Sequence, residues 1–187
     1  PVTKLEDLKG MKVRGGSRVI SIMLKQLGAT PVGMPVPAVS EALSKGVLDA
    51  TTIPYEVVPA LKVQQIVHNH TEFSGPNGLY NSTFGVVMNK ASYNKLPADL
   101  KKVIDDNSGQ NCAERFGAAM DAGDKGGKGL VQKAGNKIHV LDAQETARWK
   151  DAANGTREAW YQEVSAKGVD GKKLAATAES LIKKYTK

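Results

Sequence analysis

A short apolar strand, two glycines and an amphipathic helix follow one another at residues 11–28. The strand delivers Arg14 to the glycine pair Gly15 and Gly16, and Ser17 is typical of the residue that caps a helix N-terminus. Gly28 is placed as the C-terminal stop of that helix. The helix carries apolar residues at helical spacing: Val19, Ile20, Met23, Leu24 and Leu27. This strand, turn and helix unit restricts the fold more than any other feature, because its natural context is an α/β protein.

Strands and helices continue to alternate along the chain. Strand-like patterns occur at residues 47–53, 63–67 and 137–141, and residues 83–88 (TFGVVM) predict a buried strand. Helical patterns occur at residues 37–45, 54–61, 97–135, 144–167 and 172–185. The alternation predicts a largely parallel sheet that is covered by helices on both faces. Within the long helical pattern, residues 123–129 contain four glycines, which favours a loop as an alternative to a helix.

Arg14 is the strongest candidate for a ligand-binding residue. A guanidinium can hold a carboxylate with two parallel hydrogen bonds, and the glycine turn and the helix N-terminus beside it both favour anions. Ligands of parallel sheets bind at the carboxyl ends of the strands, where Arg14 and residues 51–55 both lie. Ser17 can join this site. The alternative is that Arg14 is an ordinary solvated charge at a strand end.

Other kinds of site have little support. The net charge of +7 is spread along the chain and aromatic residues make up only 5%, so nucleic-acid binding is not expected. His68 and His70 lack a third ligand cluster, residues 123–129 lack the Ser or Thr of a phosphate loop, and no nucleophile set is visible, which predicts neither metal nor cofactor. A binding protein is therefore favoured over an enzyme. A small hydrolase that acts on an acid or ester remains the alternative, and a structural or interaction fragment is a third possibility.

Four blocks of sequence carry a resemblance to a known family. They are residues 4–14 (KLEDLKGMKVR), 27–35 (LGATPVGMP), 41–49 (EALSKGVLD) and 96–103 (LPADLKKV). In this order and spacing they resemble the DctP family, the periplasmic solute-binding proteins of tripartite ATP-independent periplasmic (TRAP) transporters.

The resemblance implies one part of a two-lobed fold. Residues 1–92 resemble the second, carboxylate-binding lobe, a mostly parallel sheet flanked by helices. Residues 93–187 resemble the long lobe-spanning helix, a short strand and the C-terminal helices, which favours helix over loop at residues 123–129. The first lobe is not in this chain, so surfaces that it covers are expected to be exposed and to allow self-association.

The resemblance also assigns a function. The arginine of the Lys-x-Arg block binds the ligand carboxylate in the family, which gives Arg14 that role, and the captured organic acid passes to the membrane permease subunits from the periplasm. Ile53 stands where many members have Asn, and Val36 where some have an aromatic residue. With Tyr55 and Phe73 as further wall residues, we expect an apolar site that suits an aromatic or other hydrophobic carboxylate, with a C4-dicarboxylate as the alternative.

Overall fold

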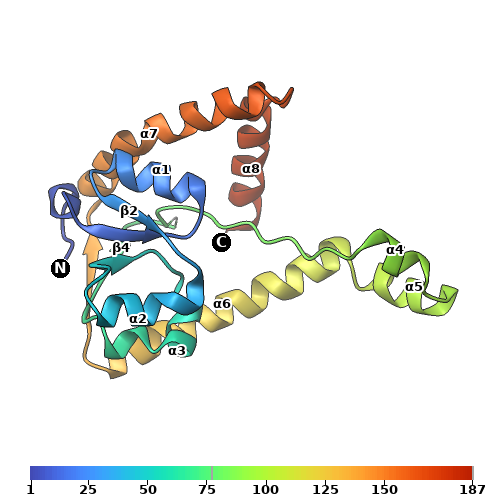
Figure 1. The fold of residues 1–187 in the computed structure, drawn as a ribbon, viewed down its shortest axis with the longest axis horizontal. Coiled ribbons are helices and arrows are strands. Elements are labelled where there is room, and N and C mark those ends of the chain that lie inside the picture. The colour runs from blue at the N-terminus through green and yellow to red at the C-terminus, as the bar shows by residue number, and fades with distance from the viewer. Residues whose placement is uncertain (77, 187) are drawn as a thin grey trace.

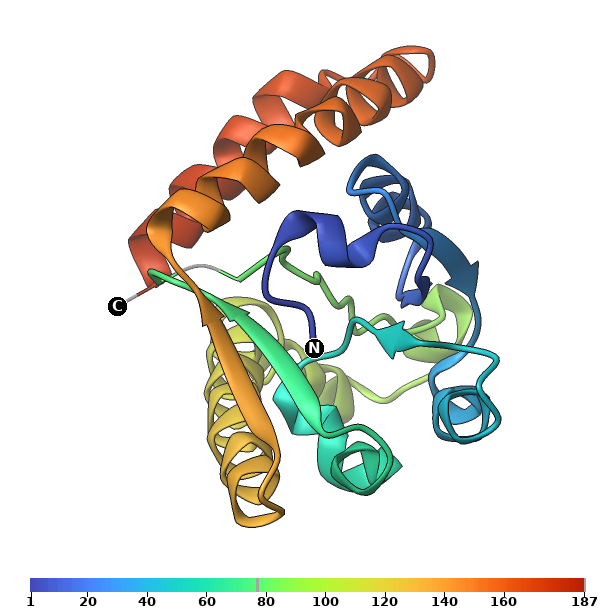
Figure 2. The same cartoon turned by 90° about the vertical axis from the view of Figure 1, so that its left-hand side faces the viewer.

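The computed structural model describes residues 1–76 and 78–186. In this part of the chain, five strands form two parallel sheets. One sheet has the order β2-β1-β3, and the other pairs β4 with β5, which lie side by side in Figure 2. The strands are β1 (Lys12–Gly15), β2 (Thr30–Gly33), β3 (Ala50–Thr51), β4 (Asn69–Phe73) and β5 (Lys137–Leu141). In the register of the first sheet Arg14 lies opposite Val32 and Thr51.

Helices lie on both sides of the first sheet, with α1 and α7 on one side and α2 and α3 on the other (Figure 1). The helices are α1 (Arg18–Gln26), α2 (Val39–Ser44), α3 (Val58–Leu61), α4 (Lys90–Asn94), α5 (Ala98–Asp106), α6 (Gly109–Lys133), α7 (Ala143–Ser165) and α8 (Gly171–Tyr185). Short 3-10 turns complete the described elements: η1 (Leu5–Leu8), η2 (Val36–Ala38), η3 (Tyr55–Val57) and η4 (Val63–Gln65). The α/β class predicted from the alternating pattern is confirmed.

The strand, turn and helix unit at the start of the chain forms as its sequence predicts. The Ser17 hydroxyl accepts a hydrogen bond from the Ile20 amide at 3.2 Å, and Gly28 adopts a positive φ of 90° just after the helix. The apolar face of α1 packs against β1 and α7 in the largest core cluster, where Leu24 is 1% exposed. Burying one such side chain stabilises a fold by about 1.5–3 kcal/mol. This cluster also includes Leu141 and Trp149, so it joins the two sheets.

An arm projects from this body. It consists of the extended residues 82–88, the helices α4 and α5, and the first half of α6 (Figure 1). Neither α4 nor α5 has a buried residue, and α6 buries only Gly127 and Val131, both in its second half. Within the described residues, no helix is long and apolar enough to cross a membrane.

Three sequence predictions are wrong in detail. The strand expected at residues 63–67 is not formed: residues 63–65 form the 3-10 turn η4, and the next strand starts later, at Asn69. Residues 83–88 are extended but unpaired and exposed instead of forming a buried strand, with Val87 91% exposed. The long helix is interrupted before Gly109, whose φ is positive, although α6 then continues as helix through residues 123–129 as the resemblance implies.

Candidate functional site

The Arg14 side chain is buried at the carboxyl ends of the first sheet, with 6% of the residue exposed. Its Nε donates a hydrogen bond to the Met34 carbonyl at 3.2 Å, just beyond β2, and its Nη1 donates to the Thr52 carbonyl at 3.3 Å, just beyond β3. No carboxylate of residues 1–76 or 78–186 forms an ion pair with it. Buried charges in proteins are normally paired, and Arg14 has no such partner among the described residues.

The glycine pair allows the guanidinium to take this position. A Cβ at Gly16 would lie 3.2 Å from Arg14 Nη1, and a Cβ at Gly15 would lie 2.5 Å from Ser21 Oγ. A side chain at either residue would therefore crowd the Arg14 group or the first turn of α1. The close approach explains why two glycines follow this strand.

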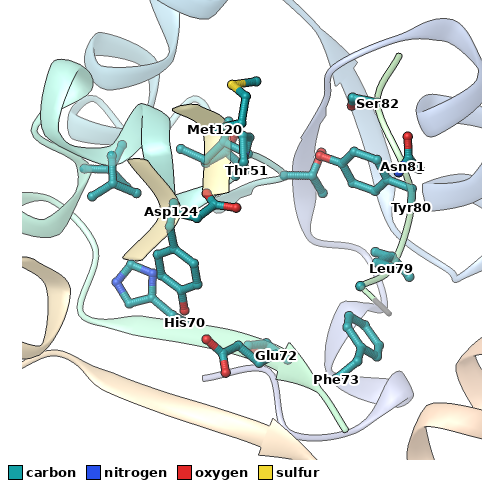
Figure 3. A pocket seen from close by; sticks show the side chains of 18 of the residues that line it. Thr51, His70, Glu72, Phe73, Leu79, Tyr80, Asn81, Ser82, Met120 and Asp124 are labelled. Atoms are coloured by element: carbon teal, nitrogen blue, oxygen red, sulfur yellow. The ribbon is translucent and has the colours of Figure 1, made fainter. Parts of the chain in front are cut away.

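A large open cleft lies beside the Arg14 group. It has a volume of about 1660 Å³ and runs between β3 and β4, with α6 and the extended residues 79–86 as further walls. Thr52, which accepts the hydrogen bond from Arg14, is one of its lining residues. Figure 3 shows Asp124 and Tyr80 pointing into the cleft from opposite sides, with Glu72 and Phe73 below them.

The predicted site residues fall into two groups. Ile53, Tyr55 and Phe73 line the cleft, and Phe73 also packs edge-on against Trp149 with 5.2 Å between the ring centroids. The other group, Arg14, Ser17 and Val36, lies around the strand ends and is not part of the cleft lining. The connection between the groups is the short segment from Thr52 to Tyr55.

Two of the strand-end residues have evident local roles. The Ser17 hydroxyl caps α1, and Val36 begins η2 with 38% of its surface exposed. Val36 follows two residues after Met34, whose carbonyl holds Arg14.

Charges inside the cleft are mainly negative. Its described lining residues include four carboxylates but no Lys or Arg: Asp49, Glu72, Asp121 and Asp124. Burial, followed by the nearby Glu72 charge, raises the pKa of the Tyr55 hydroxyl, so Tyr55 stays neutral. Lys128 offsets one negative charge through a 2.7 Å ion pair with Glu72. The described lining of the cleft therefore has no Lys or Arg, and the buried Arg14 guanidinium lies outside this lining, at the strand ends.

Sequence reasoning missed the contribution of α6 to this region. Asp124 and Met120 line the cleft, and Lys128 reaches β4 through Glu72. The only signal in the sequence was the group of glycines at residues 123–129, which predicted a loop or a helix but no contact. The described residues hold no group of three His, Cys, Asp or Glu side chains suited to a metal.

Comparison with known proteins identifies the family. The model of the DctP family, described as bacterial extracellular solute-binding protein, family 7, matches residues 1–164. The chain belongs to this family.

The chain spans about half the length of the curated relatives it matches and 57–58% of the two solved structures described below. A solute-binding protein of Albidiferax ferrireducens is 31% identical over 186 residues, which cover 97% of this chain and 52% of that protein. The crystal structure of a marine metagenome TRAP solute-binding protein specific for aromatic acids, in complex with metahydroxyphenylacetate, is 44% identical with a TM-score of 0.95 and covers 100% of this chain and 58% of that one. A TRAP solute-binding protein from Rhodoferax ferrireducens, in complex with copurified benzoate, is 42% identical with a TM-score of 0.93, covering 98% and 57%.

Membership of the DctP family decides the class of protein. The family consists of extracellular solute-binding proteins and not of enzymes, so the hydrolase alternative has no support. The match in structure also confirms that the α/β body has the fold of TRAP solute-binding proteins.

Proposed function

We propose that this chain is the carboxylate-binding part of a TRAP solute receptor and that Arg14 anchors the ligand. The observation that carries the proposal is the buried Arg14 guanidinium, which the carbonyls of Met34 and Thr52 orient but which no carboxylate of the described residues neutralises. A ligand carboxylate supplies the missing charge and accepts charge-assisted hydrogen bonds from the fork. Ser17 and the first turn of α1 lie next to this point and favour the same charge.

The favoured ligand is an aromatic monocarboxylate. Two similar solved structures carry metahydroxyphenylacetate and benzoate, and both are more than 40% identical to this chain. The residues we assign to the ligand body, Val36, Ile53, Tyr55 and Phe73, are apolar or aromatic. Such walls favour the body of a hydrophobic acid, whereas the second carboxylate of a C4-dicarboxylate would lie without a cation near the four carboxylates of the cleft.

The mechanism is capture followed by closure. In this proposal residues 1–92 bind the carboxylate, residues 93–187 supply the spanning helix and the C-terminal helices, and a first lobe folds over the ligand. Closure favoured by the ligand creates the shape that the membrane permease binds, and the whole process takes place in the periplasm. Neither cofactor nor reaction is involved.

Self-association is a further part of the proposal. The arm exposes large apolar side chains that monomeric proteins normally cover: Phe84, Val86, Val87, Met88, Leu100, Val103 and Phe116. A first lobe covers this surface in a two-lobed receptor, and in the chain alone a second copy can do so.

An NMR titration of the chain tests the function. We expect benzoate and 3-hydroxybenzoate to shift the amide signals of residues 14–17 and 52–55, and succinate to bind more weakly. Arg14→Ala should cost on the order of 1.5–3 kcal/mol of binding free energy, or roughly 10- to 150-fold in affinity, because a charged hydrogen-bonding group is lost.

The matched control is Arg18→Ala. Arg18 is exposed and pairs with Glu163 on α7, so its removal should lower affinity much less than the removal of Arg14. Equal benzoate affinity in the Arg14→Ala variant would remove Arg14 from the site, and tighter binding of succinate than of benzoate would remove the aromatic preference.

A further inference from the structure

Two glycines of α6, Gly123 and Gly127, lie where the turn η3 approaches the helix. A Cβ added at Gly127 would lie 1.9 Å from the Tyr55 carbonyl oxygen, and one added at Gly123 would lie 2.8 Å from Glu56 Cβ. Residues four positions apart lie on the same helix face, so the two glycines form one groove in which residues 55–56 lie directly on the helix backbone. No residue other than glycine fits this contact at position 127 without moving η3.

Polar contacts fix the same helix face. Asp124, between the two glycines, accepts a hydrogen bond from the Glu56 amide at 2.8 Å, and Lys128 pairs with Glu72 on β4 at 2.7 Å. In Figure 3 the Glu72 side chain lies below that of Asp124 on this side of the cleft. The groove and these contacts hold η3 and β4 against α6.

The turn η3, which packs on α6, is connected to Arg14 through the preceding residues of the chain. Thr52 lies three residues before Tyr55, and its carbonyl accepts the hydrogen bond from Arg14 Nη1. The Thr52 amide and hydroxyl in turn donate to the Arg14 carbonyl at 3.2 Å and 3.0 Å. A displacement of η3 on α6 therefore moves one of the two carbonyls that orient the guanidinium, together with the wall residue Ile53.

We propose that Gly123, Asp124 and Gly127 are positioning residues for the carboxylate site: they set the place of residues 52–56 and, through Thr52, the orientation of Arg14. The proposal rests on the proposed function for its consequence in ligand binding. The first half of the same helix belongs to the arm, so α6 connects the arm to the ligand anchor within one continuous element.

Matched controls are available on α6 itself. Gly126 and Gly129 have no atom within 4 Å of an added Cβ, so Gly126→Ala changes the same helix turn without touching η3. Asp124→Ala removes the acceptor for the Glu56 amide, whereas Asp124→Asn keeps an oxygen at that position and should restore the contact. If Gly127→Ala does not fold, the comparison of Asp124→Ala with Asp124→Asn still tests the positioning role of this helix face.

The experiment measures the Arg14 Nε–Hε signal by NMR and the affinity for benzoate in each variant. We expect Gly127→Ala and Asp124→Ala to shift this signal and to weaken benzoate binding by roughly 3- to 30-fold. Gly126→Ala should leave both as in the native chain, and Asp124→Asn should return both toward it. In an Arg14→Lys background the same changes should have a smaller effect on affinity, because a positioning residue acts through the group it positions.

The outcomes separate the two proposals. If the native chain binds no aromatic acid, the proposed function fails, but the Arg14 signal still tests the positioning role in the free protein. An Arg14 signal that is unchanged in Gly127→Ala and Asp124→Ala, or that shifts equally in Gly126→Ala, would overturn the positioning role even if benzoate binds.

Discussion

Ser17 was assigned two roles, as a helix cap and as part of the anion site. It was predicted both to cap a helix and to join the anion site, and the structure shows its hydroxyl accepting from the Ile20 amide. Ser17→Ala should therefore lower the free energy of unfolding by about 1 kcal/mol, which urea unfolding can measure.

Ser17→Asp separates the two roles. The Asp carboxylate keeps the cap, so stability should return, but its negative charge beside Arg14 competes with a ligand anion. Unchanged benzoate affinity in Ser17→Asp would place Ser17 outside the site.

His70 makes stability depend on pH. Burial, with a smaller effect of nearby His68, lowers the pKa of His70, and the Glu72 charge only partly opposes this. His70 Nε2 lies 3.2 Å from Asn136 Nδ2, a contact in which the neutral ring accepts. Below about pH 6.5 the unfolded chain takes up a proton that the folded chain does not yet bind, so stability falls as the pH falls through this range toward the lowered pKa.

His70→Gln tests this directly, because glutamine does not titrate and can still accept a hydrogen bond. Urea unfolding at about pH 7.5 and about pH 5.5 should show a smaller loss of stability on acidification in the variant than in the native chain. The same loss in both would assign the pH dependence to other groups.

At the scale of elements, the sequence predicted those helices whose start, end and apolar face depend on neighbouring residues in the chain. The helical spacing in residues 19–27 and the Gly28 stop were sufficient for α1, and the helical pattern at residues 144–167 was sufficient for α7. The strand predicted at residues 63–67 (VQQIV) did not form because so short a segment fits a strand or a turn equally well, and packing of Val63 against Val58 and Val131 favours the turn at residues 63–65.

The candidate site was predictable only in part, for a related reason. Arg14 was found because its chemistry, its glycines and its helix are all contiguous in sequence. Asp124 and Lys128 were not predicted, because their partners are distant in sequence. Glu56 lies 68 residues from Asp124, and Glu72 lies 56 residues from Lys128. Residues 83–88 were predicted to be buried because hydrophobicity shows a preference for burial but not what provides the cover.

The glycines of α6 provide an element-scale prediction. Gly126 and Gly129 have open space where a Cβ would be placed, so Gly126→Ala and Gly129→Ala should each stabilise the helix by up to about 1 kcal/mol. Thermal unfolding should show a higher midpoint for each variant. A lower midpoint would mean that an alanine at that position disturbs a contact.

At the scale of the whole molecule, the arm is the part that its own chain does not stabilise. Residues 82–88 are extended and form no backbone hydrogen bonds with the rest of the described chain, and they combine strand-forming residues with the absence of charge and proline. In the described sheets, β2, β3, β4 and β5 each have one edge without a strand partner. An exposed strand-forming segment and open sheet edges in one molecule favour pairing between molecules.

We therefore expect the chain to form dimers or larger assemblies as its concentration rises, with residues 82–88 at the contact. Val87→Lys should shift sedimentation velocity profiles toward the monomer, because Val87 is 91% exposed and a lysine on a strand edge opposes pairing. Val47→Lys is the matched control, since Val47 is 50% exposed but lies in the loop before β3, outside the arm. A chain that stays monomeric at high concentration would contradict the expectation, and an equal effect of both lysines would assign the association to general surface charge instead of the arm.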